Sequence, residues 1–222
     1  MVYLTQDALP ANPYWLHALL ENFQAPEVAG VFGKQIPKLG TNPMETYLLN
    51  RLYPDQRITK SIHSPHPLRL KNIFFSNVNS ALRKTVWQKY PFAEDVIMSE
   101  DQVWAKGAIL AGYTLIYEPQ AAVYHSHHYT LTHLFKRNFD SGVSLRGVTA
   151  DTLPQIVGNY LGYLFDEAKS IIYRSPVWLP QMILYEFVRG LGLFLGNQHR
   201  FIPLFLKRRL SLHSSYWASQ SN

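Results

Sequence analysis

The sequence predicts a mixed α/β domain over residues 1–150, followed by an all-helical extension over residues 151–222. A short strand over residues 2–6 ends at Asp7, and a helix signal comes directly after it. Strand-like and helix-like segments then alternate, whereas beyond Thr130 the apolar residues recur only at helical spacing. A carboxylate at the tip of a strand, just before a helix, lies where open α/β sheets bind their ligands.

The predicted elements follow the hydrophobic periodicity of the chain. Asn12 is a good helix N-cap, and Pro13 stands at the first helical position after it. The proline-containing stretch from Asp55 to Asn72 is predicted to be a long loop. Helices of the α/β part are predicted at residues 14–23, 43–52, 84–90 and 100–110, and strands at residues 28–36, 73–83, 114–117 and 121–124.

Composition excludes some classes of site and leaves several partners open. The chain has 222 residues and no cysteine, which excludes disulfides and thiolate metal sites. The net charge of +6 favours anionic partners such as nucleotide phosphates or anionic lipids, although solvated surface cations would give the same balance. No basic-aromatic cluster marks the α/β part as a nucleic-acid binder. The first residues lack a basic region, so we expect no signal peptide and a cytoplasmic location.

Three sets of polar residues lie where a strand ends or a helix begins. Asp7 follows the first strand, and a lone aspartate there is more often a turn former than a ligand. Glu100 and Asp101 open a helix, where acids complement the helix dipole and where a carboxylate could also act as a general base. His125 and His127 alternate on a strand end, so both imidazoles can face one side and join a carboxylate around a divalent cation.

In their order and spacing, these sets resemble an inverting family 2 glycosyltransferase of the GT-A type, most closely the bacterial rhamnosyltransferase-like branch. The resemblance covers roughly residues 2–150, and the helical tail matches less specifically. The stretches that carry it are Leu4-Thr5-Gln6-Asp7-Ala8, Gly33-Lys34-Gln35-Ile36-Pro37, Phe75-Ser76-Asn77-Val78-Asn79-Ser80-Ala81, Ser99-Glu100-Asp101-Gln102-Val103-Trp104-Ala105, Gly112-Tyr113 with Tyr117-Glu118-Pro119, and Val123-Tyr124-His125-Ser126-His127.

The resemblance implies a divalent cation, Mg2+ or Mn2+, bound to the diphosphate of a nucleotide-sugar donor. Asp7 would be the acid of the metal-binding motif, while Thr5 stands where many relatives have another aspartate. His125 matches the histidine that often completes the metal site, and His127 is the alternative.

The same resemblance implies the acid–base and substrate roles. Asp101, in the pair with Glu100, matches the catalytic base that takes the proton of the acceptor hydroxyl. For Arg137 the alternative is an exposed helix position without a ligand. The residues implied in substrate contacts are Gln6, Ser76, Asn77, Trp104 and Arg137.

The resemblance also implies a missing part. Family members carry an opening strand and a nucleotide-binding half before the metal motif, whereas Met1 lies just before Asp7. We therefore expect an incomplete GT-A mixed sheet with flanking helices, and weak or no turnover by the isolated chain. The expected activity is transfer of a sugar, with rhamnose the best match, to a saccharide acceptor in cell-surface polysaccharide synthesis. The alternative is an inactive remnant that acts as a binding or interaction module.

The helical extension carries an apolar stretch and a basic end. The stretch Val177–Gly196 contains Glu186 and Arg189, so we predict a packed or membrane-surface helix instead of a spanning one. Arg200 and the run Lys207–Arg209, beside aromatic residues, are typical of an interfacial segment. Since acceptors in the family are often lipid-linked, we expect peripheral docking at the inner face of the plasma membrane. A helical cap on the sheet or a dimer contact is the alternative.

Overall fold

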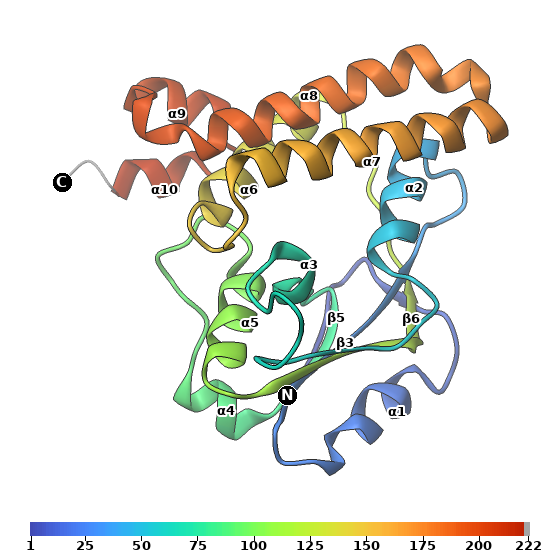
Figure 1. Cartoon of the computed structure of the whole chain (residues 1–222), viewed down its shortest axis with the longest axis vertical. Helices are drawn as coiled ribbons and strands as arrows, with labels where there is room; N and C mark the ends of the chain where they lie inside the picture. The colour runs from blue at the N-terminus through green and yellow to red at the C-terminus, as the bar shows by residue number, and fades with distance from the viewer. Residues whose placement is uncertain (220–222) are drawn as a thin grey trace. The chain divides into compact units, whose positions relative to one another are not determined.

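The computed structural model describes residues 1–219, which divide into two compact units (Figure 1). Unit 1 holds all strands of the described residues, and unit 2 is built from helices. Unit 1 comprises residues 1–93 and 101–127, and unit 2 comprises residues 94–100 and 128–219. The mixed α/β class is confirmed. The units divide after residue 127, earlier than the predicted boundary near residue 150, because the helix that follows packs within unit 2.

One sheet of mixed pairing organises unit 1. Its strands are β1 (Val2–Leu4), β2 (Leu9–Pro10), β3 (Val28–Ile36), β4 (Ile58–Lys60), β5 (Asn79–Leu82) and β6 (Thr114–Tyr124). They are ordered β1-β5-β3-β6-β2, and β4 pairs with β6 outside this path. β3 and β6 run parallel, and the other pairs are antiparallel.

Short helices accompany the sheet of unit 1. They are α1 (Trp15–Leu20), η1 (Glu21–Gln24), α2 (Pro43–Leu52), α3 (Leu70–Ile73), α4 (Lys84–Lys89) and α5 (Glu100–Leu110). The start of α2 matches the prediction because the Asn42 side chain accepts the Glu45 N–H at 2.8 Å. The predicted cap of α1 is wrong: Asn12 Oδ1 accepts the Tyr14 N–H at 2.9 Å, and the helix begins only at Trp15.

Two strand predictions in unit 1 differ from the structure. Residues 73–78 are not a strand, since β5 begins only at Asn79. The two strands predicted on either side of Pro119 form the single strand β6. The register of β3 against β6 shifts between Gly33 and Gln35, opposite this proline. Proline is tolerated there because an irregular ladder does not require its missing N–H.

Gly33 allows β5 and β6 to approach each other across β3. Asn79 Nδ2 in β5 donates to the main-chain oxygen of Ala121 in β6 at 2.6 Å, although β3 lies between these strands in the sheet order. A Cβ atom on Gly33 would lie 1.9 Å from that oxygen and 2.3 Å from Asn79 Nδ2. The bridge between β5 and β6 therefore depends on the absence of a side chain at Gly33.

A cluster of aromatic rings forms the core of unit 1, and it encloses a lysine. The Phe32 ring lies 5.0 Å from Phe75 and 5.2 Å from Tyr117, centroid to centroid. Lys60 is only 3% exposed; its Nζ donates to the main-chain oxygen of Phe74 at 2.6 Å and lies 4.9 Å from the Phe32 centroid. Burial lowers the pKa of Lys60 from 10.5 to about 7.

The buried Lys60 predicts a stability that rises with pH. The unfolded chain keeps the lysine proton up to about pH 10.5, whereas the folded chain releases it near pH 7, so the free energy of unfolding increases between these values. The increase is at most about 1.4 kcal/mol per pH unit. Urea denaturation from pH 7 to 9.5 should show it, and Lys60→Met should flatten it. The control Lys71→Met, at an exposed lysine, should leave the slope unchanged; an unaltered slope in Lys60→Met would contradict the assignment.

Unit 2 is assembled around closely packed helices. They are α6 (Leu131–Leu145), α7 (Leu153–Arg174), η2 (Pro176–Trp178), α8 (Leu179–Asn197), η3 (His199–Phe201), α9 (Leu204–Leu210) and α10 (Ser214–Ser219). A Cβ atom on Gly196 would lie 2.0 Å from the Phe139 carbonyl oxygen, and one on Gly192 would lie 2.6 Å from that of Phe135. Backbone therefore meets backbone where α6 and α8 pack, as in other helix pairs joined through small residues.

Polar side chains are buried between α7 and α8. The Tyr160 hydroxyl donates to the main-chain oxygen of Glu186 at 2.7 Å. Arg189 forms an ion pair with Glu186 at 2.8 Å and donates to the Tyr163 hydroxyl at 2.9 Å. Over residues 1–219, no helix is both long enough and apolar enough to cross a membrane.

Candidate active site

The turn that carries Asp7 connects strands with different neighbours in the sheet. Before the turn, β1 pairs with β5, and the Thr5 N–H donates to the Val78 carbonyl at 3.0 Å. After the turn, β2 pairs with β6, where Leu9 stands opposite Tyr124. Asp7 is therefore held beside the end of β6, next to the residues that follow Tyr124.

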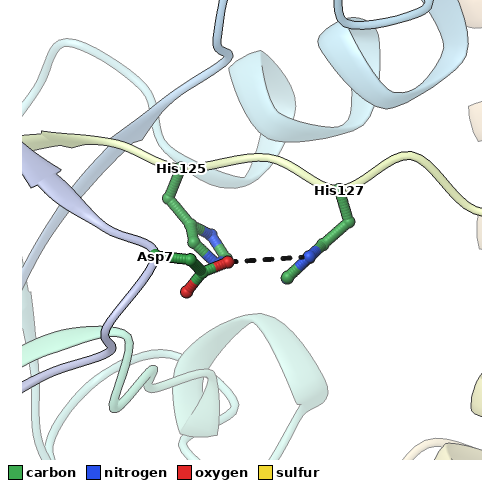
Figure 2. Close-up of side chains that lie close together, drawn as sticks. All are labelled: Asp7, His125 and His127. Atoms are coloured by element: carbon green, nitrogen blue, oxygen red, sulfur yellow. Dashed lines mark ion pairs between the residues drawn. The ribbon is translucent and has the colours of Figure 1, made fainter.

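Asp7, His125 and His127 converge on one point (Figure 2). Asp7 Oδ2 lies 3.3 Å from His125 Nε2 and 3.8 Å from His127 Nδ1. The two imidazole rings meet edge to face with their centroids 4.5 Å apart. One candidate ligand atom from each residue lies within 4.8 Å of the others, so the structure brings together the three side chains that the sequence placed in a metal site.

The surroundings of Asp7 favour its carboxylate form. Burial alone raises the pKa of Asp7, but the His125 imidazole lowers it, and so do a hydrogen bond from the Thr5 side chain and the nearby His127. The result is a pKa below the ordinary value, so Asp7 is ionised near neutral pH. The Thr5 side chain thus supports the charge on Asp7.

His125 is held from behind by a buried amide. Its main-chain N–H donates to the Ile36 carbonyl at 2.9 Å, which continues the pairing of β6 with β3. Its Nδ1 lies 2.7 Å from Gln35 Oε1, while Gln35 Nε2 contacts the hydroxyls of Tyr53 and Ser76. The imidazole therefore has one nitrogen against a fixed partner and the other toward Asp7.

Ser126, between the two histidines, anchors their segment to the chain that follows β3. Its Oγ accepts the Lys38 N–H at 3.0 Å and lies 2.7 Å from the Thr41 hydroxyl. The Lys38 ammonium donates to the main-chain oxygen of Asp7 at 2.6 Å. Lys38 therefore places a positive charge beside the main chain of Asp7.

Asp101 is linked to the candidate metal ligands through a path of contacts. Its Oδ2 accepts the main-chain N–H of Asn77 at 3.1 Å. Ser76, the neighbour of Asn77, accepts a hydrogen bond from Gln35 at 3.0 Å, and Gln35 in turn contacts His125. The predicted base and the predicted metal ligands thus belong to one connected part of unit 1.

The other predicted site residues have different positions. Gln6 is exposed in the turn that carries Asp7, and Glu100 is the first residue of α5. Trp104 is buried, and its indole N–H donates to the Tyr90 carbonyl at 2.9 Å, so it belongs to the packed core in this structure. Arg137 is exposed on α6 in unit 2.

Gln35 and Lys38 contribute to the site although sequence reasoning gave them no role. Gln35 is part of a stretch that carries the family resemblance, which was the one signal available. Lys38 follows that stretch, and as one of many cations in the chain it had no distinguishing mark. Both contacts join residues that are far apart in sequence, which local patterns do not encode.

The donor set of the site suits a divalent cation. It consists of one carboxylate oxygen and two imidazole nitrogens. Adjacent ligands of an octahedral ion with bonds of about 2.1 Å lie roughly 3 Å apart, close to the 3.3 Å and 3.8 Å separations at Asp7. Carboxylate oxygens and imidazole nitrogens are both common ligands of divalent cations, so the set fits such an ion.

Comparison with known proteins gives close sequence relatives. No family model matches the chain. The O-antigen chain rhamnosyltransferase RfbN of Salmonella typhimurium is 33% identical over 222 residues, and WbaN of Salmonella anatum, described by the same activity, is 33% identical over 220 residues. Each alignment covers 98% of this chain and 70% of the relative.

Among solved structures, the mannosyltransferase PcManGT from Pyrobaculum calidifontis, in complex with GDP-Man and Mn2+, has a TM-score of 0.46 and 14% identity. That likeness covers 99% of this chain and 53% of the other. The similarity to the two sequence relatives extends along nearly the whole chain. The chain therefore belongs to the O-antigen chain rhamnosyltransferase family, and its activity is sugar transfer in O-antigen synthesis.

Proposed function

We propose that the chain transfers rhamnose from a nucleoside-diphosphate donor to a saccharide acceptor, with a divalent cation at Asp7, His125 and His127 and with Asp101 as the base. The observation that carries the proposal is the convergence of one carboxylate and two imidazoles at the end of β6. A path of contacts runs from His125 through Gln35 to Ser76, and the N–H of the next residue, Asn77, donates to Asp101. The assignment to an inverting, GT-A-type family 2 enzyme belongs to the same proposal.

Each group of the site has a task in such a transfer. The cation, when bound, offsets the charge that develops on the leaving diphosphate. The ammonium of Lys38, which is fastened to the Asp7 main chain, adds positive charge on the same side. Asp101 accepts the proton of the acceptor hydroxyl as this oxygen attacks the anomeric carbon, and the Asn77 N–H holds the carboxylate in position.

Binding of Mn2+ to the isolated chain tests the metal assignment without a substrate. Electron paramagnetic resonance measures free Mn2+ during a titration, and His125→Ala or Asp7→Asn should weaken binding at least about 10-fold because each removes a ligand. His63→Ala replaces an exposed histidine of unit 1 and should bind Mn2+ like the wild type. If the wild-type chain binds no Mn2+, or if the three variants are indistinguishable, the metal site is refuted and the interaction-module alternative gains support.

We also propose that unit 2 docks on an anionic lipid surface. Docking there would bring the enzyme to an acceptor that is linked to a lipid. Large apolar side chains are exposed on its helices: Ile156, Val157, Leu161, Phe165, Ile172, Ile183, Leu184, Phe187, Leu191 and Phe194. Exposed cations accompany them: Lys169, Arg174, Arg200, Arg208 and Arg209. Apolar and basic surface together favour anionic lipids over a second copy of the same positive unit.

Vesicle flotation tests this docking. The chain should float with vesicles that contain phosphatidylserine and much less with neutral phosphatidylcholine vesicles. The double substitution Phe165→Ser and Phe187→Ser, at two exposed positions, should reduce flotation. Absence of binding to both kinds of vesicle would remove the proposal, and a stable dimer in analytical ultracentrifugation would show that a second copy covers this surface.

A further inference from the structure

The amide of Gln35 lies behind His125, on the side of the imidazole away from Asp7. Gln35 belongs to β3 and is 5% exposed. Its Oε1 lies 2.7 Å from His125 Nδ1, while His125 Nε2 lies 3.3 Å from Asp7 Oδ2. One imidazole nitrogen therefore meets Gln35, and the other faces the candidate cation position.

Two hydroxyl groups orient the amide. Gln35 Nε2 contacts the Tyr53 hydroxyl and lies 3.0 Å from Ser76 Oγ. An amide nitrogen carries two hydrogens and cannot accept, whereas its carbonyl oxygen can only accept. With both hydrogens directed to the hydroxyl oxygens, the carbonyl oxygen faces His125. The Nδ1 atom must then carry a hydrogen in order to donate to it.

We propose that Gln35 is a positioning residue that holds neutral His125 as the Nδ1–H tautomer and so presents the Nε2 lone pair to a cation beside Asp7. A neutral imidazole in water prefers the opposite tautomer, which would direct an N–H toward the cation position and exclude the metal. A partner that binds the far nitrogen of a metal-binding imidazole and fixes the ring in this way typically changes metal affinity by about 10–100-fold. The inference rests on the metal site of the proposed function, which it extends by one residue.

The reverse network is chemically complete and gives the opposite outcome. If the amide were turned, its nitrogen would donate to His125 Nδ1, and the hydroxyls of Tyr53 and Ser76 would donate to its oxygen. His125 would then carry its hydrogen on Nε2 and donate it to Asp7. The two networks exclude each other because Nδ1 of a neutral imidazole either carries the hydrogen or accepts one. A measurement of the tautomer therefore decides between them.

Nuclear magnetic resonance reads the tautomer in the metal-free chain. Long-range 1H–15N spectra of protein labelled with 15N-histidine, recorded at a pH where the ring is neutral, distinguish Nδ1–H from Nε2–H, and His125→Ala assigns the signal. We expect Nδ1–H in the wild type and a shift toward Nε2–H in Gln35→Leu. An Nε2–H pattern in the wild type would overturn the proposal, whether or not the chain binds a metal.

Mn2+ titration of matched variants gives the second readout. Gln35→Leu should weaken Mn2+ binding by about 10–100-fold, whereas Gln35→Glu should retain it because a carboxylate accepts the same hydrogen. Gln120→Leu, at an exposed glutamine, should bind like the wild type. Equal affinity in Gln35→Leu and the wild type would refute the role of Gln35. Should Gln35→Leu fail to fold, Tyr53→Phe removes one of the two orienting hydroxyls and should lower the share of Nδ1–H; an unchanged share would count against the proposal.

Discussion

Replacing Asp101 with asparagine is expected to lower kcat by about 10²–10⁴-fold, the contribution of a positioned general base. The variant keeps the size of the side chain and one carbonyl oxygen that can accept the Asn77 N–H, so the local structure should survive. The proton of the acceptor hydroxyl would have no acceptor, while the ligands that hold the donor would be untouched. KM for the donor should therefore change little, and initial rates of sugar transfer measure both constants.

The control for this experiment is the same substitution at Asp95, an exposed aspartate in unit 2. Asp95→Asn should retain the wild-type rate, and thermal unfolding should give similar midpoints for all three proteins. A rate in Asp101→Asn within about tenfold of the wild type would exclude Asp101 as the base.

Replacing Gly196 with alanine is expected to lower the free energy of unfolding by about 3 kcal/mol or more, at the upper end for overpacking. The new Cβ atom would lie 2.0 Å from the carbonyl oxygen of Phe139 in α6. No rotamer relieves this overlap because both atoms are fixed by helical backbone, so α6 and α8 must separate. Their separation would also disturb the neighbouring contact of Gly192 with Phe135.

Gly158→Ala and Gly162→Ala are the matched controls for Gly196. Both glycines lie in α7, and a Cβ atom there would meet nothing within 4 Å. Since alanine favours a helix more than glycine does, these variants should gain roughly 0.5–1 kcal/mol. Urea denaturation followed by circular dichroism measures all three. A loss of less than about 1 kcal/mol in Gly196→Ala would show that α6 and α8 can rearrange freely.

Local sequence patterns predicted those helices and strands whose signals lie in the segment itself or directly beside it. The strand at residues 28–36 and the helices at residues 43–52 and 100–110 have the predicted bounds. For the helix at residues 43–52, Asn42 and Pro43 mark the start. Residues 73–78 carry apolar side chains like a strand, yet their contacts are made with distant groups. Lys60 binds the Phe74 carbonyl, and Ser76 binds Gln35. No pattern within the segment records those partners.

The same distinction applies to the site. The family resemblance placed Asp7, His125 and His127 together, and the structure brings them together. The supporting contacts of Gln35 and Lys38 depend on which strands pair, and one sequence does not reveal this. The contact of Trp104 with the acceptor and that of Arg137 with a phosphate group stay predictions.

The short connection between β1 and β2 has a consequence for how the site tolerates insertions. Strands in a sheet lie about 4.8 Å apart, so a flat sheet would hold β1 and β2, at opposite ends of the strand order, far from each other. The connection between them has only residues 5–8, and it contains a turn closed by the Ala8 N–H on the Thr5 carbonyl. The sheet must therefore curl so that β1 and β2, its first and last strands, come close together. The loop of residues 5–8 joins these two strands and also carries Asp7. We therefore expect that inserting one residue into this loop would displace the Asp7 carboxylate and weaken the curl of the sheet at the same time.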